Sequence, residues 1–254
     1  MVATKIPLVH AVVAAVHRGR AADPADPTEQ AHGSLLEEFE RLSAVVDGGW
    51  DHNAWYHRWL LSQVPRPCRL ALDVGCGAGR FTLELASEAD YVFGLDISPS
   101  TVAIAERLTK RRHTPNVEYV VGDLRALDLP HDAFDCIASI ACLHHLDLEA
   151  ALRQLAVALR PGGILLVVDL GRSSGPGDWG RELVAAPVAT FLDLTHLGRL
   201  RERRAKREAW REHGEHDAQQ LTTRQVRVIA ARALPGAQVK RRLLWRYSLV
   251  WQKP

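Results

Sequence analysis

Short apolar runs with the length of β-strands alternate with helical stretches from residue 69 onward, and this alternation constrains the fold more than any other feature. Five runs occupy residues 69–75, 91–97, 117–123, 134–141 and 163–170. Three stretches with an apolar stripe at helical spacing lie between them, at residues 81–89, 99–111 and 148–160. Strands that alternate with helices form parallel βαβ units. The sequence therefore predicts an α/β domain with a mostly parallel, doubly wound sheet and helices on both faces.

Two further runs of β type, residues 237–245 and 247–253, close the chain with only Arg246 between them. So tight a connection predicts an antiparallel pair at the edge of the sheet, although a bulge or bend within one strand fits the same pattern. Residues 160–163 (RPGG) predict the end of a helix and a turn before the fifth strand.

The 254 residues are 47% hydrophobic, which is enough for one large core, and we expect one main domain with appendages. Residues 1–49 are expected to form an N-terminal helical extension and linker, because helical spacing at 8–16 and 35–46 flanks a stretch rich in Pro, Asp and Ala at 21–34. Residues 50–254 are expected to form the main domain.

A long connection, residues 171–221, separates the fifth strand from the last helix. Loops of this length in compact domains are usually functional or hold inserted helices, so we expect a cap insertion over the substrate. Within it, residues 199–212 carry seven basic and three acidic side chains. A solvated helix with salt pairs fits this pattern, as does a stripe that grips RNA or a cap that recognises an acidic substrate.

The overall charge is nearly balanced, with 32 basic and 30 acidic residues and a net charge of +2, so no global field marks a nucleic-acid or membrane-surface binder. Residues 8–16 are too short to span a bilayer and precede no signal cleavage site. The four cysteines have the spacing of neither metal ligands nor a secreted disulfide framework: Cys68, Cys76, Cys136 and Cys142. We expect a cytoplasmic monomer or homodimer without a membrane or nucleic-acid partner.

A glycine-rich turn joins the first predicted strand to a helix through Gly75, Gly77 and Gly79. Glycine lets the backbone turn sharply and approach a ligand, and free N–H groups at a helix start bind anionic groups. A tight turn that binds nothing fits the same residues. The next two strands end in Asp96 and Asp123, which would meet the turn at the carboxyl edge of the sheet.

These three strand ends together predict a nucleoside site. Asp96 is placed to accept hydrogen bonds from both ribose hydroxyls, and Asp123 from the adenine amino group. Each acid also fits a helix N-cap or a surface position. A dinucleotide site prefers G-x-G-x-x-G, whereas here the glycines alternate as G-x-G-x-G after Asp73. Because an acid there repels a pyrophosphate and attracts an ammonium group, a dinucleotide is disfavoured.

Five motifs point to one family: residues 73–79 (DVGCGAG), Asp96, Asp123, Phe134–Asp135 and residues 159–163 (LRPGG). They resemble those of the class I S-adenosylmethionine-dependent methyltransferases, most of all the small-molecule group typified by ubiquinone and menaquinone biosynthesis methyltransferases. The resemblance covers about residues 50–254. It implies a Rossmann-like sheet with a reversed last strand and S-adenosyl-L-methionine as cofactor.

The resemblance also implies where the cofactor binds. The glycine turn would border its methionine part, Asp96 would hold the ribose, and Asp123 would flank the adenine. The implied cofactor-binding residues of the main domain are Asp73, Gly75, Cys76, Gly77, Gly79, Asp96, Ile97, Asp123, Leu124, Ile140 and Ala141.

Methyl transfer is an in-line displacement that needs alignment and exclusion of water, and a base only where the acceptor must lose a proton. His144 and His145, just past the fourth strand, are the candidate catalytic residues because imidazole titrates near neutral pH. Capping of the following helix, or structural packing, accounts equally well for this pair. Asp169, at the end of the fifth strand, is a second candidate.

An aromatic and polar segment precedes the first strand, and family members often use such a segment as a lid over the cofactor. Tyr56 and His57 are the residues expected to contact the cofactor, because an aromatic ring attracts a sulfonium cation. Burial of the helix through Trp50, Trp55 and Trp59 explains the same composition.

A metal site would need Asp51, His52 and His57 to meet His144 and His145. Metal-dependent relatives carry acids at the end of the fourth strand, where this chain has Leu-His-His, so we expect no metal. The expected function is methylation of an O, N or C nucleophile on a small molecule, including specialised metabolites. A non-methylating reaction of the sulfonium, such as cyclisation, and RNA methylation are the alternatives.

Overall fold

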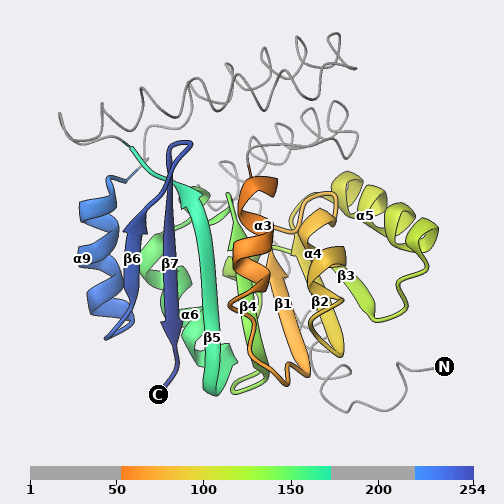
Figure 1. Ribbon diagram of the computed structural model, residues 1–254, viewed down its shortest axis with the longest axis horizontal. Coiled ribbons are helices and arrows are strands. Elements are labelled where there is room, and N and C mark those ends of the chain that lie inside the picture. The colour runs from red at the N-terminus through yellow and green to blue at the C-terminus, as the bar shows by residue number, and fades with distance from the viewer. Residues whose placement is uncertain (1–52, 173–220) are drawn as a thin grey trace, which may run out of the picture.

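The computed structural model describes residues 53–172 and 221–254, and Figure 1 shows them as one α/β domain. The predicted N-terminal extension at 1–49 and nearly all of the predicted cap at 171–221 lie outside the described residues, so both stay predictions. The elements are α3 (Ala54–Leu61), β1 (Leu70–Val74), α4 (Arg80–Leu85), β2 (Tyr91–Asp96), α5 (Pro99–Arg112), β3 (Val117–Val121), η2 (Leu124–Ala126), β4 (Phe134–Ile140), η3 (Leu143–His145), α6 (Leu148–Ala158), β5 (Leu159–Leu170), α9 (Thr223–Ala233), β6 (Gln238–Arg241) and β7 (Arg246–Gln252).

Seven strands form one sheet in the order β3-β2-β1-β4-β5-β7-β6. Strands β1 to β5 pair in parallel, and β7 is antiparallel to both of its neighbours, β5 and β6. The predicted parallel sheet with a reversed last strand is confirmed. The strand order reverses between β1 and β4, which opens a crevice for ligands outside the carboxyl ends of these strands.

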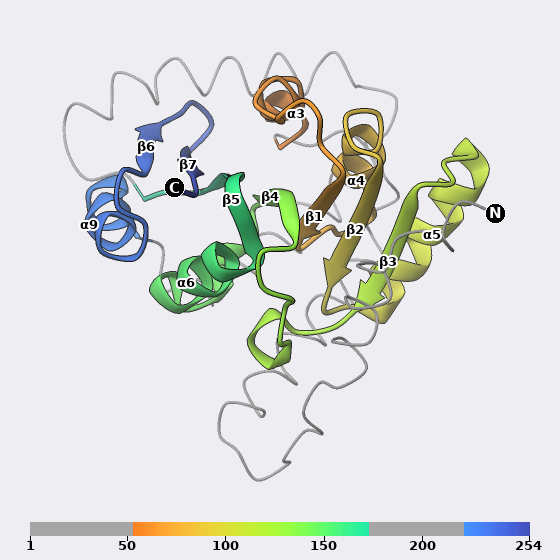
Figure 2. The same cartoon turned by 90° about the horizontal axis from the view of Figure 1, so that it is seen from below.

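Helices cover both faces of the sheet, as predicted (Figure 2). One apolar cluster joins α3 and α4 to one face, and a larger cluster joins α6 and α9 to the other. The helix α5 packs on β2 and β3. The central strands are buried on both faces, with β1 (LALDV) buried at every position. Such strands alternate little between apolar and polar residues, which is why they appear in the sequence as continuous apolar runs.

The break after α6 comes earlier than predicted. The helix ends at Ala158, and Leu159 already pairs with Phe134 in β5. The segment 160–163 therefore lies inside β5, at a shift of register between the two strands. Gly162 has a φ of 77°, and its N–H donates to the carbonyl of Lys253 at 2.9 Å. The expected turn residue is present, but it forms an irregularity in a long strand.

The predicted C-terminal antiparallel pair is confirmed, with one difference in its order. The last strand, β7, lies between β5 and β6, and β6 forms the edge. Arg246 is the first residue of β7, and the turn before it contains Leu244 and Trp245.

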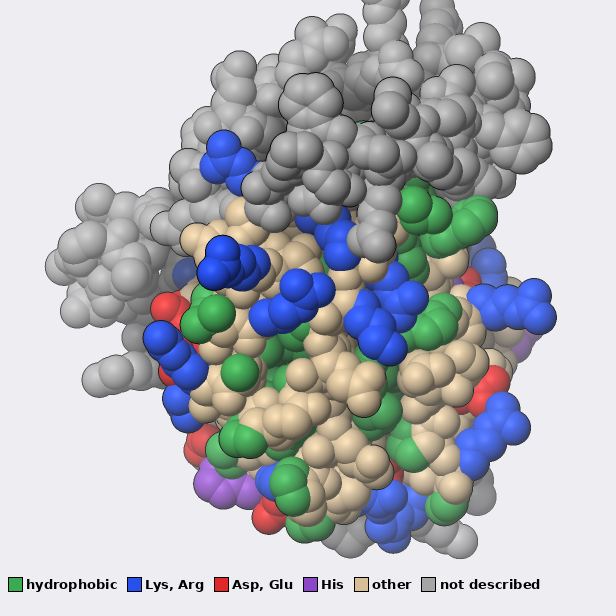
Figure 3. All heavy atoms as spheres, turned by 60° about the vertical axis from the view of Figure 1, so that its left-hand side comes forward, with side chains coloured by type: hydrophobic (Ala, Val, Ile, Leu, Met, Phe, Trp, Pro, Cys, Tyr) green, Lys and Arg blue, Asp and Glu red, His purple; other side chains and the backbone are tan. Residues whose placement is uncertain are grey.

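Positive charge gathers on the side of the molecule formed by α9, β6 and β7 (Figure 3). Residues 221–254 contain eight Lys and Arg residues and no Asp or Glu. Arg224, Arg227, Arg232 and Lys240 are exposed there. The net charge of +2 therefore conceals a local positive field on this side.

A buried carboxylate, Asp135, holds the amino ends of the two central strands together. Its Oδ2 accepts the N–H of Arg69 at 3.0 Å and that of Leu70 at 2.8 Å, and its Oδ1 forms an ion pair with Arg160. The family motif Phe134–Asp135 therefore has a structural role in this chain, at the end of the sheet opposite to the crevice.

Replacing Asp135 with Ala leaves two N–H groups and the Arg160 guanidinium without their acceptor. We expect Asp135→Ala to lower the free energy of unfolding by about 3 kcal/mol in urea titrations. Glu149→Ala is the matched control, because it breaks the exposed ion pair with Arg153 and should cost below about 1 kcal/mol. Equal losses in the two variants would contradict the clamp.

Candidate active site

The candidate site lies at the carboxyl edge of the sheet, where the segments that follow β1, β2, β4 and β5 come together (Figure 1). The glycine turn follows β1, Asp96 ends β2, and the histidine pair follows β4. Asp169 lies at the end of β5. Parallel pairing places all of these residues at the same edge because the strands share one direction.

The glycine turn (residues 75–79) has a left-handed backbone at all three glycines, with φ values of 72°, 53° and 77°. The N–H groups of Gly75 and Cys76 both donate to the carbonyl of Leu95, at 2.8 and 3.0 Å, so the turn continues the pairing of β1 with β2. A side chain at Gly75 would collide with Cys142 after β4. A side chain at Gly77 would meet nothing within 4 Å, so the turn offers open space there for a ligand to approach the backbone.

Asp96 connects the end of β2 to the glycine turn. Its Oδ2 accepts the N–H of Gly77 at 2.8 Å, and its Oδ1 accepts the N–H of Ser98 at 3.0 Å. Burial raises the pKa of this carboxyl, and the hydrogen bonds from backbone N–H groups act against that rise. A carboxylate has about four acceptor sites, so Asp96 retains acceptor capacity for ligand hydroxyls beyond these two bonds. Ile97 follows it and is half-buried.

Asp73 lies beneath the glycine turn and is almost completely buried. Its Oδ2 accepts the hydroxyl of Thr82 in α4 at 2.6 Å. Burial raises the pKa of Asp73 to about 6, while the Thr82 bond and the nearby His57 lower it. An anionic carboxylate in this place is therefore destabilised unless positive charge reaches it.

Two residues that support the turn, Thr82 and Tyr119, were not identified from the sequence. The hydroxyl of Tyr119 in β3 lies against Gly79, within hydrogen-bonding reach of Thr82, and 3.0 Å from the hydroxyl of Thr109 in α5. A polar chain therefore runs from Asp73 through Thr82 and Tyr119 to α5. The only signal for it in the sequence is Thr82, a threonine among the apolar residues of the stretch that forms α4.

Asp123 takes the capping role that the sequence left open. It is the N-cap of η2, where its carboxylate accepts the N–H of Arg125 at 2.9 Å. The same carboxylate accepts from the Arg125 guanidinium, at 2.7 Å in the closest bond. Leu124 next to it is buried in the core. Contact of these two residues with an adenine stays a prediction.

The backbone is strained where β4 ends. Ala141 has a φ of 52°, which is unusual for a residue with a Cβ, and its N–H donates to the carbonyl of Val168 at 2.8 Å. Ile140 and Ala141 are both half-buried. Strained backbone of this kind concentrates at functional sites, because the surrounding structure has to enforce it.

His144 and Asp169 form a hydrogen-bonded pair, which unites two of the predicted chemical groups. The His144 Nδ1 lies 2.6 Å from Asp169 Oδ1, and the His144 backbone N–H donates to Asp169 Oδ2 at 2.9 Å. Both side chains are buried. The His145 ring contacts the His144 ring in a tilted arrangement, with a centroid distance of 3.9 Å and an interplanar angle of 42°. The N-cap of the following helix is Asp147, so neither histidine has the capping role.

The two lid candidates, Tyr56 and His57, are buried and hold α3 in place. The Tyr56 hydroxyl donates to the carbonyl of Leu243 at 2.6 Å, and burial raises its pKa to about 12. His57 Nδ1 lies 3.1 Å from Glu84 Oε1, and its ring contacts Phe81 edge-on. These contacts show anchoring to the β6–β7 turn and to α4, and contact with a cofactor stays a prediction.

The tryptophans of the same segment differ from each other in the structure. Trp59 has the Arg242 guanidinium 4.1 Å above its ring, whereas Trp55 is exposed. Burial of Trp55 as an anchor, one of the alternatives above, is therefore not what the structure shows. Trp50 lies outside the described residues.

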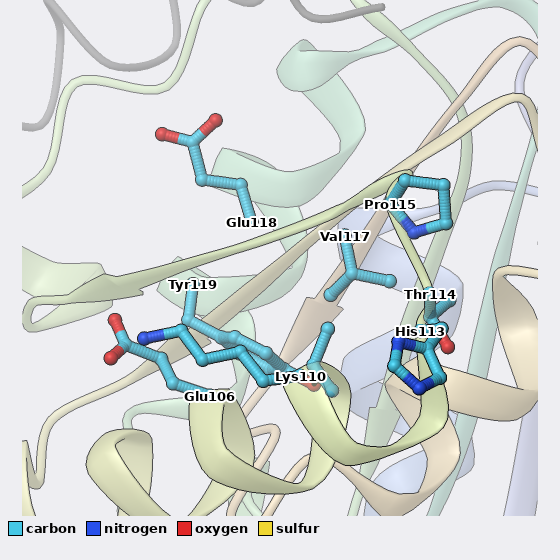
Figure 4. A pocket seen from close by; sticks show the side chains of 9 residues that line it. Glu106, Lys110, His113, Thr114, Pro115, Val117, Glu118 and Tyr119 are labelled. Carbon is cyan, nitrogen blue, oxygen red and sulfur yellow. Dashed lines mark hydrogen bonds between the residues drawn. The ribbon is translucent and has the colours of Figure 1, made fainter. Parts of the chain in front are cut away.

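A groove of about 660 Å³ lies between α5 and β3, away from the site (Figure 4). Its lining comes from the C-terminal half of α5, from residues 113–115 after it and from residues 117–119 at the start of β3. Glu118, one of the lining residues, accepts a hydrogen bond from the Tyr91 hydroxyl at 2.8 Å. Because this groove opens at the amino end of β3, it is no candidate for the nucleoside site.

Residues 53–172 and 221–254 contain no group of three or more His, Cys, Asp or Glu side chains arranged for a metal ion. Asp51 and His52, which the predicted alternative metal site would need, lie outside them. None of the helices in the described part of the chain has the length and apolar character needed to cross a membrane.

Comparison with known proteins gives a consistent result. Residues 72–167 match the family model described as a methyltransferase domain. An uncharacterised methyltransferase of Mycobacterium tuberculosis is 30% identical over 216 residues, which cover 82% of this chain and 100% of that protein. A ubiquinone/menaquinone biosynthesis C-methyltransferase of Vibrio cholerae is 29% identical over 56% of each chain.

A solved structure has a similar fold. The N-methyltransferase NodS of Bradyrhizobium japonicum, in complex with S-adenosyl-L-homocysteine, superposes with a TM-score of 0.58 at 20% identity. The superposition covers 86% of this chain and 98% of that one. At this identity the likeness shows the fold.

The raised pKa of Asp73 makes a testable prediction about stability. The folded protein holds the Asp73 proton up to about pH 6, whereas the unfolded chain releases it near the ordinary value of 3.8, so the free energy of unfolding falls as pH rises between these values. From pH 5 to pH 7 this contribution falls by about 1 kcal/mol. Asp73→Asn removes the titration, so its stability relative to the unaltered protein should rise by that amount in urea titrations. A difference that is independent of pH would contradict the assignment.

Proposed function

Because the chain belongs to the class I S-adenosylmethionine-dependent methyltransferases, we propose that it methylates an O, N or C nucleophile of a small molecule at the carboxyl edge of its sheet. The observation that carries this proposal is the 2.6 Å pair between His144 Nδ1 and Asp169 Oδ1, beside the glycine turn. Family membership accounts for the cofactor, and this pair offers a group that accepts a proton from the methyl acceptor.

The glycine turn and two acids beside it fit S-adenosyl-L-methionine on three observations. Gly77 has open space next to its backbone, so a ligand can approach it closely. Asp96 has unused acceptor capacity for hydroxyl groups, as a ribose requires. Asp73 is a buried carboxylate with a raised pKa, and the ammonium group of a methionine moiety would favour its anionic form.

When bound, S-adenosyl-L-methionine would supply an electrophilic methyl group on a sulfonium, with a neutral thioether as its leaving group. The chain's own residues remove the proton from the acceptor. Asp169 accepts the Nδ1–H of His144, which leaves Nε2 with its lone pair and fixes the orientation of the ring. His144 Nε2 then takes the proton that a hydroxyl or amine acceptor loses. The Asp169 carboxylate stabilises the imidazolium that results.

Cofactor binding is tested by titration calorimetry with S-adenosyl-L-homocysteine. We expect the unaltered protein to bind and Asp96→Ala to lose at least about tenfold in affinity, because a half-buried acceptor for ligand hydroxyl groups is removed. Asp90→Ala is the matched control: Asp90 is exposed and precedes β2 at the opposite end of the sheet, so affinity should not change. Failure of the unaltered protein to bind would overturn the proposal.

The His144–Asp169 pair is tested by kinetics with radiolabelled S-adenosyl-L-methionine and a protic acceptor found by screening. His144→Ala should lower kcat by about 100-fold or more, in the range that general bases contribute. His145→Ala is the control, expected to cost less than tenfold, because it is His144 that bonds Asp169. Calorimetry should show unchanged cofactor affinity in both variants. An unchanged kcat in His144→Ala would exclude its role as the base.

A further inference from the structure

The turn between β6 and β7 is built from residues that its backbone conformation does not favour. The Arg246 N–H donates to the carbonyl of Leu243 at 3.3 Å, and the two residues between them, Leu244 and Trp245, have φ values of 55° and 54°. Turns with two left-handed central residues normally carry Asn and Gly there. Bulky side chains in this conformation are strained, and such strain persists where it serves a function.

The strained turn buries one side chain and presents the other. Leu244 is 0% exposed and Trp245 is 39% exposed. Leu244 therefore has a packing role, whereas core packing does not explain a tryptophan at the next position. A glycine there would satisfy the backbone without strain.

Trp245 lies at the same edge of the sheet as the His144–Asp169 pair. Its carbonyl accepts the N–H of Gly171 at 3.0 Å, directly after β5. In the sheet, Arg246 pairs with Leu170, and Tyr247 pairs with Asp169. The β6–β7 turn is thus joined to the strand end that carries Asp169.

The first turn of α3 brings a second exposed tryptophan to this place. The Arg246 guanidinium donates to Asn53 Oδ1 at 3.0 and 3.2 Å, and Tyr56 donates to the carbonyl of Leu243. Trp55 lies between Asn53 and Tyr56 in the sequence and is 47% exposed. Figures 1 and 2 both show the start of α3 beside the β6–β7 turn. We call Trp55 and Trp245 the aromatic rim.

We propose that the aromatic rim stacks on the methyl acceptor, and that the acceptor is therefore a planar aromatic compound with a nucleophilic hydroxyl or amine. This inference rests on the proposed function, because it assigns the substrate class of the same site. Large apolar side chains are exposed at five described positions: Trp55, Val121, Val157, Val228 and Trp245. The two aromatic ones belong to the β6–β7 turn, which is bonded to the end of β5, and to the first turn of α3, which is bonded to that turn. Indole faces add stacking to apolar contact only when the ligand is itself aromatic.

The test uses two probes that share a carbon skeleton and a hydroxyl group: 2-naphthol, which is planar and aromatic, and decahydro-2-naphthol, which is neither. Both are titrated calorimetrically into the full chain saturated with S-adenosyl-L-homocysteine. We expect 2-naphthol to bind at least about tenfold more tightly than its saturated counterpart, which is the size of one stacking contact.

Three variants separate binding from folding. Trp245→Gly removes the ring and relieves the strained backbone, so we expect an unfolding temperature no lower than that of the unaltered protein together with a roughly tenfold loss of 2-naphthol affinity. Trp245→Phe should retain most of that affinity. Val228→Ala, an exposed apolar change on α9, should alter neither quantity.

The outcomes distinguish this inference from the proposed function. If S-adenosyl-L-homocysteine fails to bind, the proposed function fails. If it binds, but the two probes bind equally or Trp245→Gly keeps its affinity for 2-naphthol, the aromatic rim is not an acceptor site and this inference alone is overturned.

Discussion

The strand β1 pairs in parallel with β2 on one side and with β4 on the other, and the candidate site depends on this arrangement. Parallel pairing brings the carboxyl ends of the strands to one edge, and the reversal of strand order at β1 keeps that edge open. The pairing continues into the glycine turn, since Leu95 of β2 accepts the N–H groups of both Gly75 and Cys76. At the opposite end, Asp135 of β4 holds the start of β1 through two backbone N–H groups. Both ends of the central strands are thus held by hydrogen bonds from neighbouring strands.

Buried carboxylates have opposite tasks at the two ends of the sheet. Asp135 has its partners within the protein, two N–H groups on Oδ2 and an ion pair with the Arg160 guanidinium, so its contribution is to stability. Asp73 has a raised pKa and the hydroxyl of Thr82 as its bonding partner, so its charged form gains most from a cation supplied by a ligand. Asp169 holds His144 in one orientation. The same side chain therefore serves stability or function according to which groups surround it.

Strained backbone occurs at two places along the carboxyl edge. Ala141 after β4 and the pair Leu244–Trp245 before β7 have left-handed backbones that cost stability, and both lie beside Asp169 or its neighbours in β5. Rigid surroundings maintain this strain, including the bonds from Tyr56 to Leu243 and from Arg246 to Asn53. A site in which an acceptor must align with a methyl group requires this rigidity, because small displacements lower the rate steeply.

The sequence by itself determined the alternation of strands and helices, the glycine turn and the acids at the ends of β2 and β5, because each is encoded by residues that are near one another in the chain. Only the tertiary structure decided that Asp169 pairs with His144 and that Asp73 bonds Thr82, which lies within reach of the Tyr119 hydroxyl. It also decided that β7 lies between β5 and β6 and that Trp245 is presented beside α3. The physical reason is that hydrophobic periodicity and turn chemistry act locally, whereas a hydrogen bond such as that from Tyr56 to Leu243 joins residues 187 positions apart, and only packing brings them together.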